Sequence, residues 1–168
     1  MLAVLRAEEV GKTYYSGLIF RKRQRILEGV TLQMEEGRTV GLMGVSGSGK
    51  TTLGKIMAGL ERPTSGRVLY SGKEIWSMQG REMLAFRRQV QMVFQDPEGS
   101  LNPRKSIKSS IHEVLSLLKV PAKKWQERTA EILEMVGLSE EIVCRYPAQI
   151  SGGQCQRVAL GRALLLRP

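Results

Sequence analysis

The sequence of 168 residues is poor in several residue types, and each shortage argues against a class of protein. No apolar run approaches the roughly 20 residues that a transmembrane helix needs. The two cysteines, Cys144 and Cys155, fit no metal-binding spacing and are expected to be reduced thiols. The single histidine, His112, is interpreted as a surface or half-buried helix residue rather than a ligand. The N-terminus carries no signal-peptide pattern, so the cytoplasm is the expected compartment.

Acidic residues are also scarce, with 16 against 26 basic ones, which gives a net charge of +10. Such a charge can indicate a nucleic-acid or anionic-membrane partner. The densest basic cluster, residues 21–25 (RKRQR), has Phe20 beside it but few aromatic residues to stack on bases. We therefore interpret this cluster as a solvated loop.

The apolar pattern predicts a mixed α/β part that a mainly helical part, roughly residues 96–150, interrupts. Predicted strands are residues 2–10, 26–34, 39–43, 66–70 and 89–94. A helix is predicted to follow the strand at 39–43 and to end near Gly59. Apolar residues at helical spacing predict a helix from Ser106 that Pro121 ends and a second one that Gly137 ends. Ser139 opens a short third helix, which must finish before Pro147.

Residues 44–51, GVSGSGKT, match the phosphate-binding pattern G-x-x-x-x-G-K-[ST] between a predicted strand and a predicted helix. Glycines let several backbone N–H groups point at one anion, and the helix N-terminus adds partial positive charge. The nucleotide-binding candidates are Gly44, Ser46, Gly47, Ser48, Gly49, Lys50, Thr51 and Thr52. We expect Lys50 to reach the β- and γ-phosphates, Thr51 to bind Mg²⁺ and Thr52 to contact the α-phosphate. A glycine-rich turn without a ligand is the alternative, and the pattern does not separate transport ATPases from kinases, GTPases or helicases.

Three further features, in the right order, resemble the ATP-binding subunits of ABC transporters. Tyr14, in VGKTYY, falls where the family has the aromatic residue that stacks on adenine, with the adjacent Tyr15 as the alternative. Gln95, at the end of the predicted strand QMVF, resembles the glutamine of the family's Q-loop. Residues 150–154, ISGGQ, resemble the signature LSGGQ, with Ile150 in place of the usual leucine. The resemblance covers essentially the whole chain.

The resemblance implies an α/β fold: a P-loop NTPase core with an antiparallel β part and an inserted helical subdomain, incomplete at the C-terminus. The chain would be a single partial nucleotide-binding domain, with a β-rich and P-loop core at 1–95, a helical subdomain at 96–150 and the signature helix at 151–168. Lys50 and Gln95 would be catalytic, and Thr51 and Gln95 would bind the metal. Ser151 would cap the following helix, and the signature residues Ser151, Gly152, Gly153 and Gln154 would contact ATP held by a second subunit in a head-to-tail dimer.

Residues 95–104, QDPEGSLNPR, and Phe86-Arg87-Arg88 resemble the ATPases of dipeptide, oligopeptide and nickel importers. The resemblance implies an ATP-binding subunit that couples ATP binding and hydrolysis to the uptake of peptides, nickel or related solutes. ATP and Mg²⁺ would be its cofactors. Its partners would be a second ATP-binding subunit, transmembrane permease subunits and, indirectly, a solute-binding protein, with no nucleic acid. It would lie as a peripheral protein on the cytoplasmic face of the membrane.

The family's Asp-Glu pair, which follows the signature helix and supplies the general base, does not occur within the 168 residues. We therefore expect this chain alone to lack hydrolytic activity. One alternative is a truncated nucleotide-binding protein that does not hydrolyse ATP. The other is a basic nucleic-acid-binding module with an incidental P-loop.

Overall fold

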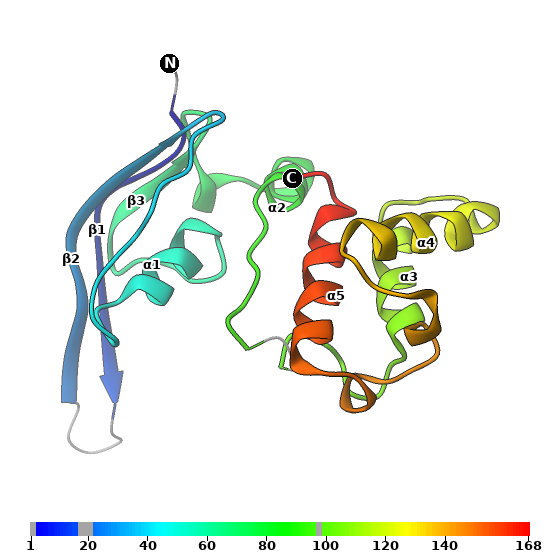
Figure 1. The fold of residues 1–168 in the computed structure, drawn as a ribbon. Helices are drawn as coiled ribbons and strands as arrows, with labels where there is room; N and C mark the ends of the chain where they lie inside the picture. The colour runs from blue at the N-terminus through cyan, green and yellow to red at the C-terminus, as the bar shows by residue number, and fades with distance from the viewer. Residues whose placement is uncertain (1–2, 17–21, 97–98) are drawn as a thin grey trace. The chain divides into compact units, whose positions relative to one another are not determined.

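The computed structural model describes residues 3–16, 22–96 and 99–168. The chain forms two compact units, one up to Val90 and one from Gln91 onward, which are described separately below (Figure 1). Within the described residues, no helix has the length and apolar character needed to cross a membrane.

Unit 1 is built on a four-stranded antiparallel sheet in the order β2-β1-β3-β4 (Figure 1). Its strands are β1 (Ala3–Ser16), β2 (Lys22–Glu35), β3 (Ser65–Tyr70) and β4 (Lys73–Glu74). The strands predicted near 2–10, 26–34 and 66–70 are confirmed. The interpretation of the basic cluster as a loop is wrong for residues 22–25, because Arg23 and Arg25 pair with Tyr15 and Thr13 and continue the β1–β2 ladder. Arg21 lies outside the described residues.

A bulge in β1 decides which of its side chains face the core. The register between Ala7 and Val10 is irregular, and Glu9 adopts a positive φ of 49°. Ala7 and Val10 are both fully buried although three positions separate them, so the inward-facing phase changes from odd to even residues at the bulge.

Helix α1 (Lys50–Met57) buries Leu53, Ile56 and Met57 in the core of unit 1, which also contains Val10 of β1 and Val68 of β3. The helix ends at Ala58, and Gly59 follows with a φ of 69°, as the sequence predicted. The 3₁₀ turn η1 (Ile75–Ser77) and helix α2 (Gly80–Gln89) complete the unit. Phe86 of α2 is buried, and its ring lies edge-on to Tyr70 with centroids 5.3 Å apart.

The strands predicted at 39–43 and 89–94 are wrong. Residues 38–45 contain neither helix nor strand, α2 extends through Gln89, and residues 90–94 are irregular. Met43 is 94% exposed, and Leu42, Val93 and Phe94 are also exposed. An apolar run becomes a strand only when another strand satisfies its backbone groups, and none in the described part of the chain pairs with either run.

Unit 2 is helical, with α3 (Ile107–Leu117), α4 (Trp125–Met135) and α5 (Gly152–Leu164) as its main elements (Figure 1). Short 3₁₀ turns link them: η2 (Ala122–Lys124), η3 (Glu140–Ile142) and η4 (Pro147–Gln149). The three predicted helices after Ser106 are confirmed, because Ser106 and Ser139 cap the helices that follow them and Gly137 has a φ of 65°. Their apolar faces meet in one core, which contains Leu101, Ile107, Ile111, Leu115, Ile132, Leu133, Val136, Leu138, Ile142, Cys155 and Val158.

The scarce residues of the sequence also lie in unit 2. His112 is half-buried on α3 and packs on Trp125 with ring centroids 4.8 Å apart, as expected for a helix residue. Burial and the nearby charge of Lys108 lower the pKa of His112 below its ordinary value. Neither Cys144, which is exposed, nor Cys155, which is buried, forms a disulfide, and the thiol of Cys155 lies 3.6 Å from the carbonyl oxygen of Pro147.

We predict that Gly66→Ala destabilises the protein more than Gly72→Ala. Both glycines have positive φ, 74° and 81°, so alanine at either position brings a backbone penalty of about 1–2 kcal/mol. A Cβ at residue 66 would also lie 2.2 Å from the carbonyl oxygen of Glu9, whereas one at residue 72 would meet nothing within 4 Å. Denaturant unfolding of the two variants measures the difference, and equal losses of stability would contradict this account of β3.

Candidate functional site

The loop before α1 has the backbone shape expected of a phosphate-binding loop. Gly47 and Gly49 adopt φ values of 80° and 92°, a region that favours glycine. At Gly47 an added Cβ would meet nothing within 4 Å, so the backbone there is open. At Gly49 it would lie 2.7 Å from Cδ2 of Leu27 and 3.0 Å from the carbonyl oxygen of Ile26. The second glycine therefore lets the loop press against β2, while the first leaves its outer surface bare.

Lys50 fixes the shape of this loop. Its ammonium donates to the carbonyl oxygens of Gly44 at 2.8 Å and Val45 at 2.7 Å, and it lies 3.4 Å from Oγ of Ser48. No side chain caps the first turn of α1, whose N-cap is Gly49. A lysine ammonium enclosed by the loop and an uncapped helix N-terminus beside it form a positive site that fits an anion such as a phosphate.

Thr51 and Thr52 occupy the first turn of α1. The side chain of Thr51 is exposed, and that of Thr52 is half-buried. The hydroxyl of Thr51 is a hard oxygen donor of the kind that Mg²⁺ prefers, as is the side-chain amide oxygen of Gln95. Both residues therefore suit the metal that the sequence assigned to them; Thr51 lies in unit 1 and Gln95 in unit 2.

Tyr14 is held beside α1 by a small polar cluster. Its hydroxyl donates to Oε1 of Glu61 at 2.5 Å, and the ammonium of Lys12 donates to the same oxygen at 2.9 Å. The ammonium of Lys12 also lies 5.0 Å from the centroid of the Tyr14 ring, within the range of a cation–π contact. Tyr15, the alternative in the sequence, is 61% exposed and lies opposite Arg23.

The cluster shifts the pKa values of its two acids in opposite directions. The hydrogen bond to Glu61, aided by partial burial, raises the pKa of Tyr14 above its ordinary value of 10.0, although a hydrogen bond with Thr52 opposes this. Burial raises the pKa of Glu61, but the hydrogen bonds from Tyr14 and Lys12 outweigh it, so the pKa lies below its ordinary value. The tyrosine is therefore a neutral donor and the glutamate a charged acceptor over a wide pH range.

Gln95 lies in an exposed bend of unit 2, not at the end of a strand as predicted. Two features of the described residues in the segment after Gln95 are defined. The N–H of Gly99 donates to Oδ1 of Asp96 at 3.1 Å, and Leu101 is buried.

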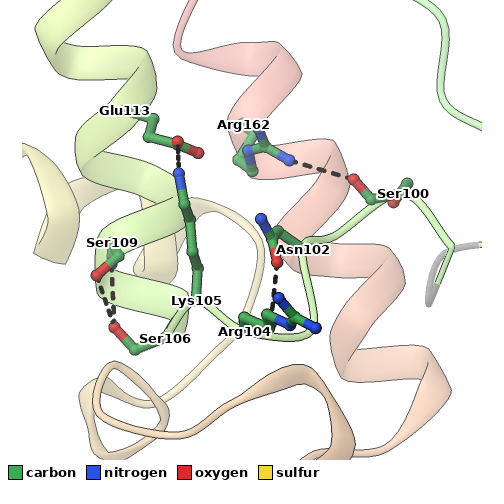
Figure 2. Close-up of polar contacts among 8 residues, drawn as sticks. All are labelled: Ser100, Asn102, Arg104, Lys105, Ser106, Ser109, Glu113 and Arg162. Carbon is green, nitrogen blue, oxygen red and sulfur yellow. Dashed lines mark hydrogen bonds and ion pairs between the residues drawn. The ribbon is translucent and has the colours of Figure 1, made fainter.

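The same segment is tied to α5 and leads directly into α3 (Figure 2). Nη1 of Arg162 donates to the carbonyl oxygen of Ser100 at 3.4 Å, and the N–H of Arg104 donates to Oδ1 of Asn102 at 2.9 Å. Lys105, which precedes α3, forms an ion pair with Glu113 of that helix (Figure 2). The chain after Gln95 is therefore positioned by the helix that carries the signature.

The signature residues form the start of α5. Oγ of Ser151 accepts from the N–H of Gln154 at 3.2 Å, and Oε1 of Gln154 accepts from the N–H of Ser151 at 2.9 Å, which is a capping box. Gly152 and Gly153 are exposed, and a Cβ at Gly153 would meet nothing within 4 Å. The predicted cap by Ser151 is confirmed, and the two glycines leave the first turn accessible.

The structure brings the predicted residues together within each unit. In unit 1, Tyr14 lies near α1, and the loop from Gly44 leads into that helix. In unit 2, the residues from Ser151 to Gln154 form the start of α5. Sequence reasoning missed Lys12 and Glu61, which hold Tyr14. Lys12 lies in the segment VGKTYY, which assigns a role only to the aromatic residue; Glu61 belongs to no recognised motif, and 49 positions separate the two residues along the chain. Lys12 and Glu61 come together only in the folded structure, where β1 lies next to the segment after α1.

A model of the ABC transporter family matches residues 27–168 of the chain. A nickel import ATP-binding protein, NikE, of Pseudomonas putida is 42% identical over 99% of this chain and 62% of its own length. An oligopeptide transport ATP-binding protein, OppF, of Lactococcus lactis is 43% identical over 94% of this chain and 51% of its own length. The chain therefore spans less than two thirds of these curated relatives.

Solved structures give the same result for the fold. A dimeric structure of a bacterial ABC transporter cassette is 32% identical and has a TM-score of 0.84, covering 98% of this chain and 70% of its own. The same TM-score is found for a dimeric ATP-binding cassette in a post-hydrolysis state bound to ADP and Pi. The predicted α/β class and ABC ATPase core are thus confirmed.

We predict that Glu61→Ala lowers the pKa of Tyr14 toward its ordinary value, because the variant removes the charged acceptor that stabilises the neutral phenol. Ultraviolet titration of tyrosinate measures this, with Tyr14→Phe subtracted to isolate one of the four tyrosines. Since the folded-state pKa is raised, the stabilisation is present below pH 10 and is lost as pH rises through the folded value. An unchanged titration curve in Glu61→Ala would contradict the hydrogen bond.

We predict that Ser151→Ala destabilises α5 by about 1 kcal/mol, because it removes the acceptor for the N–H of Gln154. Ser151→Asp is the matched control, since aspartate caps a helix about as well as serine and should retain the stability. Denaturant unfolding followed by circular dichroism compares the two. Equal destabilisation by both variants would show that the cap contributes nothing.

Proposed function

The chain belongs to the ABC transporter family, and on this premise we propose that it is the ATP-binding subunit of an importer. In this proposal the subunit couples ATP binding and hydrolysis to the uptake of nickel, peptides or related solutes. These solute classes are supported by relatives that are themselves named as nickel, oligopeptide and dipeptide transport proteins. The candidate residues of this chain are suited to a nucleotide and not to a cargo.

The observation that carries the proposal is the enclosure of Lys50 by the loop. Its ammonium bonds to carbonyl oxygens of the loop and not to a carboxylate, so its charge is not neutralised there. A polyphosphate that approaches the loop meets this ammonium, the bare backbone at Gly47 and the uncapped turn of α1. We propose that Gly44, Ser46, Gly47, Ser48 and Gly49 surround the phosphates.

Each remaining residue of the site has a proposed role in ATP chemistry. Lys50 withdraws charge from the β- and γ-phosphates, and Thr52 contacts the α-phosphate. Thr51 and Gln95 are the residues that would hold Mg²⁺, which would supply positive charge against the phosphates. Gln95 also orients the attacking water, and Tyr14 stacks on the adenine ring. Hydrolysis is proposed for the whole protein, since the chain spans less than two thirds of its relatives.

The start of α5 supports a second ATP-binding subunit as partner. Ser151, Gly152, Gly153 and Gln154 present an exposed first turn, and an exposed helix start attracts anions. We propose that this turn contacts ATP bound to the partner in a head-to-tail dimer. A similar cassette has been solved as a dimer, which agrees with this arrangement.

The remaining partners follow from the importer proposal. Transmembrane permease subunits would bind this subunit at the cytoplasmic face of the membrane, and a solute-binding protein would act through them. We retain residues 1–95, 96–150 and 151–168 as the proposed core, helical subdomain and signature helix.

We predict that Lys50→Ala abolishes measurable ATP binding, because it removes the one charge held inside the loop. Lys73→Ala is the matched control, since Lys73 forms an exposed ion pair with Glu82 in the same unit and such pairs contribute little. Isothermal titration calorimetry with ATP on both variants and the wild type gives the comparison. ATP binding that survives in Lys50→Ala with unchanged affinity would remove the phosphate-loop proposal.

A further inference from the structure

We propose that Glu61 is a positioning residue that, together with Lys12, fixes the ring of Tyr14 as a preformed platform for the nucleobase. This inference rests on the proposed ATP-binding function and names two residues that no motif of the sequence assigned. It places the base on the ring face that Lys12 does not cover.

Two donors converge on a single oxygen of Glu61. The Tyr14 hydroxyl is 2.5 Å and the Lys12 ammonium 2.9 Å from Oε1. Lys12 has a second acceptor, the carbonyl oxygen of Arg62, at 2.7 Å. The carboxylate is thus a bridge between β1 and the segment after α1, and charged hydrogen bonds of this kind are stronger than neutral ones.

These contacts restrict each way in which the ring can move. A phenol ring whose hydroxyl is anchored can still rotate about the axis through its oxygen. The ammonium of Lys12, 5.0 Å from the ring centroid, disfavours that rotation because a cation prefers the face of the ring to its edge. Tyr14 is therefore held both in place and in plane before a ligand binds.

The pattern of burial leaves the ring as the accessible member of the cluster. The side chains of Lys12 and Glu61 are 14% and 23% exposed, whereas Tyr14 is 39% exposed. An accessible, fixed aromatic surface suits a flat apolar group, and base–aromatic stacking contributes about 1–3 kcal/mol. A ring that is already ordered loses less conformational entropy when a base binds to it.

Backbone contacts connect β1, which carries Tyr14, to the segment after α1, and the core connects β1 to α1 itself. The N–H of Thr13 donates to Oγ1 of Thr64 at 3.0 Å, and the N–H of Thr64 donates to the carbonyl oxygen of Gly11 at 2.8 Å. Val10 of β1, the strand that carries Tyr14, and Leu53 of α1 lie in the same core. Tyr14 and the phosphate-binding loop therefore belong to one compact unit, as a ligand with a base at one end and phosphates at the other requires.

The test separates base binding from phosphate binding by comparing ATP with inorganic tripolyphosphate. We expect Glu61→Ala to weaken ATP binding roughly 3- to 10-fold, the range for one lost hydrogen bond, and to leave tripolyphosphate binding unchanged. Tyr14→Phe should show the same loss, and the double variant should show no further loss, because the two side chains act as one unit. Glu61→Gln keeps an acceptor and should retain most of the ATP affinity.

Calorimetry on the purified protein measures these affinities, with Glu82→Ala as a control for removal of an exposed acid in the same unit. Unchanged ATP affinity in Glu61→Ala, or equal losses for ATP and tripolyphosphate, would overturn the inference. If Glu61→Ala does not fold, Tyr14→Phe and Glu61→Gln carry the test, and an ATP affinity in Tyr14→Phe equal to that of the wild type would overturn it. A wild type that binds neither ligand would overturn the proposed function itself and this inference with it.

Discussion

The contact on which the candidate site depends is that between the Lys50 ammonium and the carbonyl oxygens of Gly44 and Val45. This charged donor draws the two carbonyl groups toward itself, and at Gly47 an added Cβ would meet nothing within 4 Å, so the backbone there stays open. The loop can take this path only because Gly47 and Gly49 adopt positive φ and Gly49 has no side chain to collide with Leu27. The uncapped start of α1 follows from the same geometry.

The local features of the fold could be predicted because their causes are local. Ser106 and Gly137 mark helix ends through caps that involve only a few neighbouring residues. The strands at 39–43 and 89–94 were wrong for the opposite reason, since a strand depends on a partner that an apolar run does not specify. In the site, the loop around Lys50 could be predicted because its neighbouring residues form a recognisable sequence pattern. Glu61 could not be found, because its contact with Tyr14 joins β1 to the segment after α1 across 47 positions of the chain.

The start of α5 shows that a motif can have two physical roles at once. Ser151 and Gln154 bond to each other's backbone N–H groups and so stabilise the helix. The two glycines between them leave the first turn uncovered. Loss of function after a change at either polar residue therefore does not by itself indicate contact with a ligand. The Ser151→Asp variant separates the two roles, because it keeps the helix cap and introduces a negative charge that repels phosphate.

The bridge from β1 to the segment after α1 has a consequence for how the protein responds to its ligand. Glu61, Lys12 and Tyr14 join parts of the chain that are distant in sequence, and a molecule seated on both the ring and the loop would add a further connection between them. Binding of this kind occurs only in the folded state. By mass action, the melting temperature of unit 1 would then rise with the free nucleotide concentration, so that nucleotide supply would set the lifetime of this unit as well as its occupancy.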